Sequence, residues 1–129
     1  MLSMKWLAFF SFILFLTADA PKARAFWFFG SSTIAIPIFN LAIKGRGFSP
    51  QELLVPSGKK FKLVVSNENL EPSEFESFSL HREQVVGAHS KITVFLGPLQ
   101  PGKYDFFDDF HSHVNGTLKA SPSPTRQSQ

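Results

Sequence analysis

Short runs in which apolar and polar residues alternate follow one another between residues 38 and 120. In "KFKLVVSN" the side chains of Phe61, Leu63 and Val65 fall on one side, and "FNLAIKG", "KITVFLG" and "KYDFF" repeat the same period of two. A period of two is typical of a β-strand with one buried face. Pro, Gly, Asn and Ser separate the runs, "GFSP" is expected to be a turn, and no run has a helical period. The pattern predicts an all-β fold, an antiparallel sandwich or barrel.

The first 25 residues have the layout of a secretory signal peptide. Lys5 precedes the apolar run "WLAFFSFILFL", which is shorter than the roughly 20 apolar residues of a membrane-spanning helix. Two small-x-small sites follow, at residues 18–20 and 23–25, and Pro21 disfavours cleavage at the first. We therefore expect residues 1–25 to be removed after Ala25 and the protein to be exported to the periplasm; the alternative is an uncleaved membrane anchor.

The remaining chain is expected to hold one domain with two flanking segments. Residues 26–37 are an apolar mature N-terminal segment, which either packs on the domain or meets a membrane. Residues 38–120 carry the alternating runs and are the predicted domain. Residues 121–129 are polar and rich in proline, so they are expected to be a disordered tail.

Composition excludes several classes of function. Without residues 1–25 the chain has ten basic and nine acidic residues, so it offers no electrostatic basis for binding nucleic acid. It has no cysteine, which excludes disulfides, thiolate catalysis, zinc–thiolate sites and iron–sulfur clusters. There is also no Gly-rich phosphate loop and no nucleophile elbow.

Acids and histidines gather in "KYDFFDDFHSH", residues 103–113. Asp108 continues the phase of the strand residues before it, whereas Asp109 has the opposite phase and reaches the same site only where the strand end bends. His111 and His113 follow, and imidazole is the commonest metal-ligating side chain. The stretch is either a metal site or a solvated loop after a strand.

A second candidate group lies in "EFES". Glu74 and Glu76 are two residues apart, so they share one face of a strand. If that face is buried, a metal ion or Arg82 must compensate their charge; if Phe75 and Ser77 face inward, both carboxylates face water. The pattern leaves both arrangements open. His81, at the end of this strand, is a weaker candidate ligand.

The order of these segments resembles a known family. "GFSPQELLVPSGKKFKLVVSN", "EFESFSL", "VFLGPLQPGKYDFF" and "FHSHVNGTLKA" follow one another as the strands of cupredoxin-like domains do, most of all those of bacterial periplasmic iron-uptake systems. The resemblance covers residues 38–120. It implies a Greek-key β-sandwich.

The resemblance also implies which positions correspond to blue-copper ligands. The first histidine corresponds to Glu74, the cysteine to Asp108, the second histidine to His111, and the methionine to Val114 or Asn115. A blue-copper centre requires a copper–thiolate bond, so this chain is excluded from that class. The remaining carboxylate and imidazole groups suit copper(II), iron, manganese or zinc.

We therefore expect an exported, metal-binding protein of the cupredoxin-like kind that handles iron or copper in the periplasm. The expected ion is copper or iron, and the resemblance implies ferroxidase-type oxidation of Fe(II) or delivery to a membrane iron permease or another uptake component. Whether the chain is an enzyme stays open. The alternative is a metal-free structural or docking subunit of a membrane transport complex. The candidate ligands are Glu74, Glu76, Asp108, Asp109 and His111, with His81 and His113 as weaker candidates.

Overall fold

Strands make up all the regular structure in the part of the chain that the computed structural model describes, residues 34–123. The predicted signal peptide, most of the segment 26–37 and the end of the tail lie outside these residues. No helix of the described part is long and apolar enough to cross a membrane. The strands are β1 (Ile38–Lys44), β2 (Gly47–Ser49), β3 (Glu52–Pro56), β4 (Phe61–Asn67), β5 (Ser73–Ser77), β6 (Arg82–Val86), β7 (Lys91–Leu96), β8 (Gly102–Asp108) and β9 (His111–Ser121).

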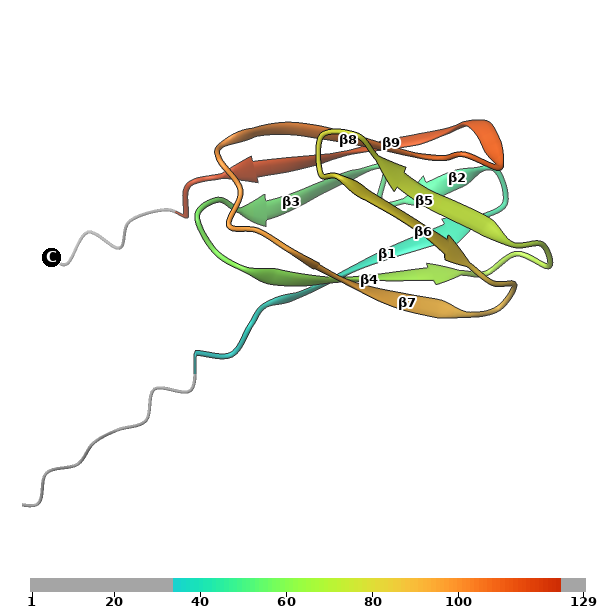
Figure 1. The fold of residues 1–129 in the computed structure, drawn as a ribbon, viewed down its shortest axis with the longest axis horizontal. Helices are drawn as coiled ribbons and strands as arrows, with labels where there is room; N and C mark the ends of the chain where they lie inside the picture. The colour runs from blue at the N-terminus through green and yellow to red at the C-terminus, as the bar shows by residue number, and fades with distance from the viewer. Residues whose placement is uncertain (1–33, 124–129) are drawn as a thin grey trace, which may run out of the picture. The chain divides into compact units, whose positions relative to one another are not determined.

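Two sheets pack face to face (Figure 1). The first sheet has the order β2-β1-β4-β7 and the second has the order β3-β9-β8-β5-β6. The predicted all-β sandwich is confirmed. The sheets are mixed rather than purely antiparallel, because β1 runs parallel to β4 and β3 runs parallel to β9. Both parallel pairs join strands that are distant in sequence, as expected where a Greek-key chain crosses between sheets.

The core lies between the sheets and follows the predicted period of two. On β4 the side chains of Phe61, Leu63 and Val65 are fully buried, as the alternation predicted. The second sheet contributes the rings of Phe75 and Phe106, whose centroids are 5.5 Å apart. Burying each large apolar side chain stabilises the fold by roughly 1.5–3 kcal/mol.

Two short elements were not predicted. Residues 47–49 of the expected turn "GFSP" form β2, which pairs with β1, and the Phe48 ring packs edge-on against Phe106 at 4.8 Å. A three-residue strand is too short to show a period, so its one buried residue gave no signal. The turn lies earlier, at Gly45, where φ is +57°. Strand β6 was missed because Val86 is its only buried residue.

Strand β5 positions the candidate ligands. It lies between β8 and β6, with Phe75 opposite Asp108 and Glu76 opposite both Phe107 and Glu83. The inward side chains of β5 are Ser73, Phe75 and Ser77. The glutamates between them therefore point to the outer face of the second sheet, the second of the two arrangements that the sequence left open.

Candidate functional site

The predicted metal ligands do not form one centre, because they lie on two faces of the second sheet. Asp108 and His111 belong to the interior side, at the turn between β8 and β9. Glu74, Glu76 and Asp109 belong to the outer face. The division follows from strand alternation, because Asp108 and Asp109 are successive residues at the end of β8 and point to opposite sides.

Asp108 is a buried carboxylate with a complete set of donors. It is 1% exposed. Its Oδ1 accepts hydrogen bonds from the backbone N–H groups of Glu74 at 2.9 Å and Phe110 at 3.1 Å. Its Oδ2 lies 2.9 Å from Nδ1 of His111. Burial raises the pKa of Asp108, but the hydrogen bonds from Glu74 and His111 outweigh it and hold the pKa below its usual value.

His111 bridges two carboxylates. Its Nδ1 faces Asp108, and its Nε2 lies 3.7 Å from Oε2 of Glu71, in the loop between β4 and β5. The imidazole thus links the β8–β9 turn to that loop. Both ring nitrogens already face carboxylate oxygens, so a metal ion at this position would have to displace one of them.

The interior position does not fit a blue-copper centre. The resemblance gives Asp108 and His111 the positions of the cysteine and second histidine, but these two side chains contact each other directly. The first-histidine position, expected at Glu74, needs correction, because the Glu74 carboxylate points to the opposite face and only its N–H reaches Asp108. Ser73 is the β5 residue on the inner side. Its buried Oγ has no hydrogen-bond partner of good geometry within residues 34–123, and a hydroxyl does not replace an imidazole ligand.

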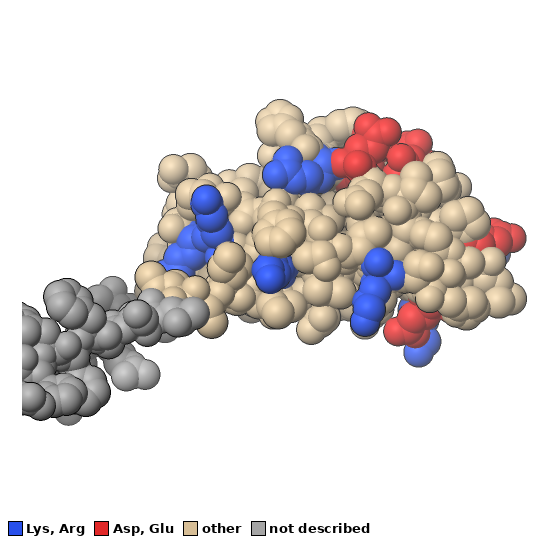
Figure 2. Space-filling view, turned by 60° about the horizontal axis from the view of Figure 1, so that its bottom comes forward, with Lys and Arg blue, Asp and Glu red and all other residues tan. Residues whose placement is uncertain are grey.

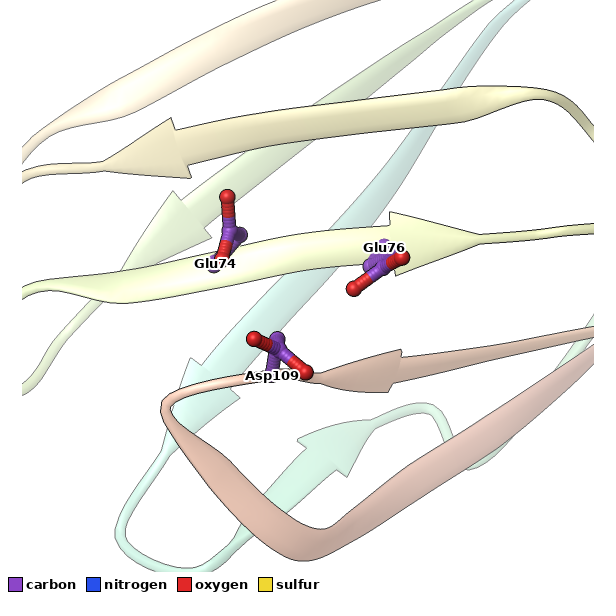
Figure 3. Close-up of side chains that lie close together, drawn as sticks. All are labelled: Glu74, Glu76 and Asp109. Atoms are coloured by element: carbon purple, nitrogen blue, oxygen red, sulfur yellow. The ribbon is translucent and has the colours of Figure 1, made fainter.

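The outer face carries a cluster of carboxylates, which we call the acidic cluster: Glu74, Glu76 and Asp109, with Glu83 beside them. One oxygen from each of the first three lies within 4.8 Å of the others. Figure 3 shows Glu74 and Glu76 side by side on β5, with Asp109 next to them at the end of β8. A backbone hydrogen bond of 3.2 Å from the Asp109 N–H to the Glu74 carbonyl fixes this approach.

Repulsion within the acidic cluster is not compensated. Burial raises the pKa of Glu74, and the charges of Glu83, Asp109 and Glu76 raise it further. Burial, Asp109 and Glu83 raise the pKa of Glu76 in the same way. Glu74 is 9% exposed, yet no basic side chain of the described residues forms an ion pair with any member of the cluster.

Arg82 is the basic residue that the sequence offered as a compensator. Its guanidinium instead donates to the backbone carbonyls of His81 at 2.9 Å and Phe95 at 3.2 Å. Arg82 also lines a shallow pocket with Glu76 and Glu83, but it forms no ion pair with either carboxylate. Its hydrogen-bonding capacity is directed to backbone carbonyls rather than to the acidic cluster.

The remaining candidates lie at the edges of these two groups. His81 is exposed in the β5–β6 turn and lines a shallow pocket with Glu76 and Glu83. His113 lines an open groove of about 640 Å³ together with His111 and Glu71. Glu83 was not among the predicted ligands, because its place opposite Glu76 depends on β6, which has no alternating pattern.

Comparison with known proteins agrees with this fold. The sequence matches the family model described as a cupredoxin-like domain over residues 7–120. It is 44% identical over 72 residues to a protein of Rickettsia prowazekii (strain Madrid E) that is described as uncharacterized. That match covers 56% of this chain and 58% of the relative, so the chain spans less than two thirds of its length.

Solved structures of similar fold have low sequence identity. The reduced auracyanin of Roseiflexus castenholzii gives a TM-score of 0.59 at 14% identity, covering 68% of this chain and 99% of auracyanin. The metal-binding domain of the Cu(I)-exporting P-type ATPase CopA of Streptococcus pneumoniae, with Cu(I), gives 0.56 at 11%, covering 65% and 84%. Amicyanin of Paracoccus versutus gives 0.52 at 14%, covering 67% and 81%. At these identities the likeness shows the fold alone.

Proposed function

The chain belongs to the cupredoxin-like domain family, and on that premise we propose that it binds a metal ion through the acidic cluster rather than at the interior position of a blue-copper centre. One observation carries the proposal. Three carboxylate oxygens lie within 4.8 Å of one another, and one of them belongs to the nearly buried Glu74, which has no basic partner among the described residues. A cation would remove the repulsion that raises the pKa values of Glu74 and Glu76.

The chemistry of the ligands limits the ion. Carboxylate oxygens are hard ligands, and soft Cu(I) prefers thiolate and thioether groups, which the acidic cluster lacks. Of the copper and iron ions that the resemblance implies, copper(II) and iron therefore suit the acidic cluster better than Cu(I), and these are the ions we propose. Copper is named, as Cu(I), with two proteins of similar fold, and iron is implied only by the resemblance to periplasmic uptake domains.

The proposed setting is iron or copper handling outside the cytoplasm, after export by the predicted signal peptide. There the domain would hold the ion and deliver it to a membrane iron permease or another uptake component. Asp109 is exposed, so an ion held in the cluster would stay accessible from one side, which favours binding and delivery over an enclosed redox centre. Oxidation of Fe(II) releases an electron and requires an acceptor, so we include no oxidation step.

Calorimetric titration of the full chain without a tag tests the metal site. Copper(II), Fe(II) under anaerobic conditions and Fe(III) are added separately. We expect saturable binding that Glu74→Gln and Asp109→Asn each weaken by at least 10- to 100-fold, the range typical of damage around a metal site. Glu52→Gln is the matched control, because Glu52 is an exposed carboxylate on β3, outside the acidic cluster, and its loss should leave the affinity unchanged.

Two results would contradict the metal site as proposed. If His111→Ala abolishes binding while Glu74→Gln has no effect, the ion is held at the interior position. If no ion gives saturable binding, the metal function is wrong and a docking function remains.

The side chain of Phe78 favours docking as the second candidate function, because it is 72% exposed on the same outer face and its ring lies 5.3 Å from that of Phe107.

A further inference from the structure

Lysines surround one end of the sandwich, which we call the basic end: Lys59, Lys60, Lys62, Lys103 and Lys119. It is the end at which the described chain enters β1 and leaves β9. Figure 2 shows basic side chains next to the point where the described chain begins, and the largest group of acidic side chains away from it. The acidic cluster lies at the β8–β9 turn, at the other end of those strands. The acidic cluster therefore lies away from the basic end, whereas other basic residues, among them Lys44, Arg46 and Lys91, lie outside the basic end.

Backbone hydrogen bonds bring four segments together at the basic end. The N–H of Ser57 donates to the carbonyl of Ser121, and the N–H of Gly58 donates to the carbonyl of Leu99, each at 2.8 Å. The N–H of Lys62 donates to the Pro37 carbonyl, also at 2.8 Å. These bonds join the β3–β4 turn, the β7–β8 loop, the entering chain and the end of β9. The lysines of these segments are held on a fixed frame.

Two lysines of the basic end repel each other. Lys103 lies directly opposite Lys119 in the β8–β9 pairing, and like charges in such positions destabilise a sheet. Within residues 34–123 none of the five lysines forms an ion pair. The nearest acid along β8 is Asp105, whose Oδ1 accepts a hydrogen bond from the Thr117 hydroxyl at 3.0 Å. An anionic partner would relieve this repulsion.

Apolar side chains lie beside the lysines. Ile34, Ile36 and Ile38 are exposed on the entering chain, and Leu54 is 60% exposed on β3 opposite Lys119. Residues 26–33, which remain after the expected cleavage at Ala25, precede this end in the sequence and include the apolar run "FWFF". Lysines beside exposed apolar side chains are typical of a surface that binds at a membrane interface.

We propose that the basic end docks on an anionic lipid surface. The five lysines contact the head groups, and the isoleucines of the entering chain bury their apolar surface at the boundary with the acyl chains. A nucleic acid or another soluble polyanion would use the lysines but not the isoleucines, which is why we favour lipid. Docking in this way leaves the acidic cluster facing the aqueous side, and it does not depend on the proposed metal function.

Vesicle co-sedimentation of the full chain tests this proposal. Vesicles of phosphatidylcholine alone are compared with vesicles containing phosphatidylglycerol, at low and high salt. The triple variant Lys59→Gln, Lys103→Gln, Lys119→Gln should lose on the order of 100-fold in affinity for the anionic vesicles at low salt, since each lysine near such a surface contributes roughly fivefold. A matched triple variant, Lys44→Gln, Arg46→Gln, Lys91→Gln, makes the same change in net charge elsewhere and should bind like the wild type.

Three outcomes would overturn the proposal. The first is equal binding of the wild type to neutral and anionic vesicles at low salt, a result that needs no variant to fold. The second is an equal loss of affinity in both triple variants, which would indicate net charge rather than this surface. The third is a soluble polyphosphate that binds as tightly as the anionic vesicles through the same lysines, which would make the basic end a general polyanion site.

Discussion

Removing the Asp108 side chain should destabilise the domain far more than a typical single substitution. In Asp108→Ala the N–H groups of Glu74 and Phe110 and the ring of His111 all lose their acceptor. A buried donor without an acceptor costs about 1–3 kcal/mol. Because His111 is partly exposed and can turn to water, we expect a total loss of about 4 kcal/mol. That is a large share of the roughly 5–15 kcal/mol by which a domain is stable.

The isosteric variant separates shape from charge. Asp108→Asn keeps a carbonyl oxygen for the two backbone N–H groups, and its amide can donate to Nδ1 of a neutral His111. We therefore expect a loss of only about 1–2 kcal/mol, the difference between charge-assisted and neutral hydrogen bonds. Urea denaturation of the three proteins at neutral pH measures these differences. Asp105→Asn is the control, because Asp105 is exposed on the same strand and should change stability by less than about 0.5 kcal/mol.

The pH dependence gives an independent check. Burial raises the pKa of Asp108, but hydrogen bonding outweighs it and holds the pKa below its usual value of 3.8. The charge of Asp108 therefore stabilises the fold above pH 3.8, and this stabilisation is lost as the pH falls through the lowered pKa. The difference between wild type and Asp108→Asn should therefore be largest near neutral pH and shrink below pH 3.8. A loss below about 1 kcal/mol in Asp108→Ala, or a wild type–Asn difference that does not change with pH, would refute this account of Asp108.

Two further predictions concern the acidic cluster and the core. Burial and neighbouring acids raise the pKa values of Glu74 and Glu76, so metal-free wild type should lose stability as the pH rises through the raised values. Glu74→Gln should therefore raise Tm at pH 7, and this gain should disappear below pH 4.5. A lower Tm of the variant at pH 7 would contradict this. In Gly116→Ala the added Cβ would overlap the Phe106 ring and lie 2.9 Å from the Gln51 carbonyl oxygen. Urea denaturation should therefore show that the free energy of unfolding falls by roughly 1–3 kcal/mol or more. An unchanged midpoint would mean that the ring can move.

The sequence predicted the strands in which apolar and polar residues alternate. The buried residues of β4 and the inward phase of Phe106 and Asp108 follow from alternation, because each strand has one buried face. Strand β6 could not be predicted in this way. As an edge strand it has four exposed residues in succession, and its place is set by pairing with β5 rather than by burial.

The candidate site was predicted as a set of residues but not as an arrangement. The pattern gave Asp108 and Asp109 opposite phases, yet it left open whether a bend at the strand end would bring both to one site; the structure keeps them on opposite faces. It also left open which way the Glu74 side chain points, because the residue pattern of this strand does not show which of its two faces is buried. The choice is made by Phe75, whose ring fills the core against Phe106 and turns its neighbours outward.

One carboxylate inside the domain sets the spacing of those outside. The Asp108 carboxylate accepts a hydrogen bond from the Glu74 N–H on the interior side, and the Asp109 N–H donates to the Glu74 carbonyl. These two bonds fix the backbone that carries Glu74 and Asp109. The oxygens of the cluster lie within 4.8 Å of one another, close enough to bind the same ion. Because their backbone is held in place, the carboxylates need little rearrangement to close around an ion. The affinity of a surface site would then depend on a hydrogen bond in the interior.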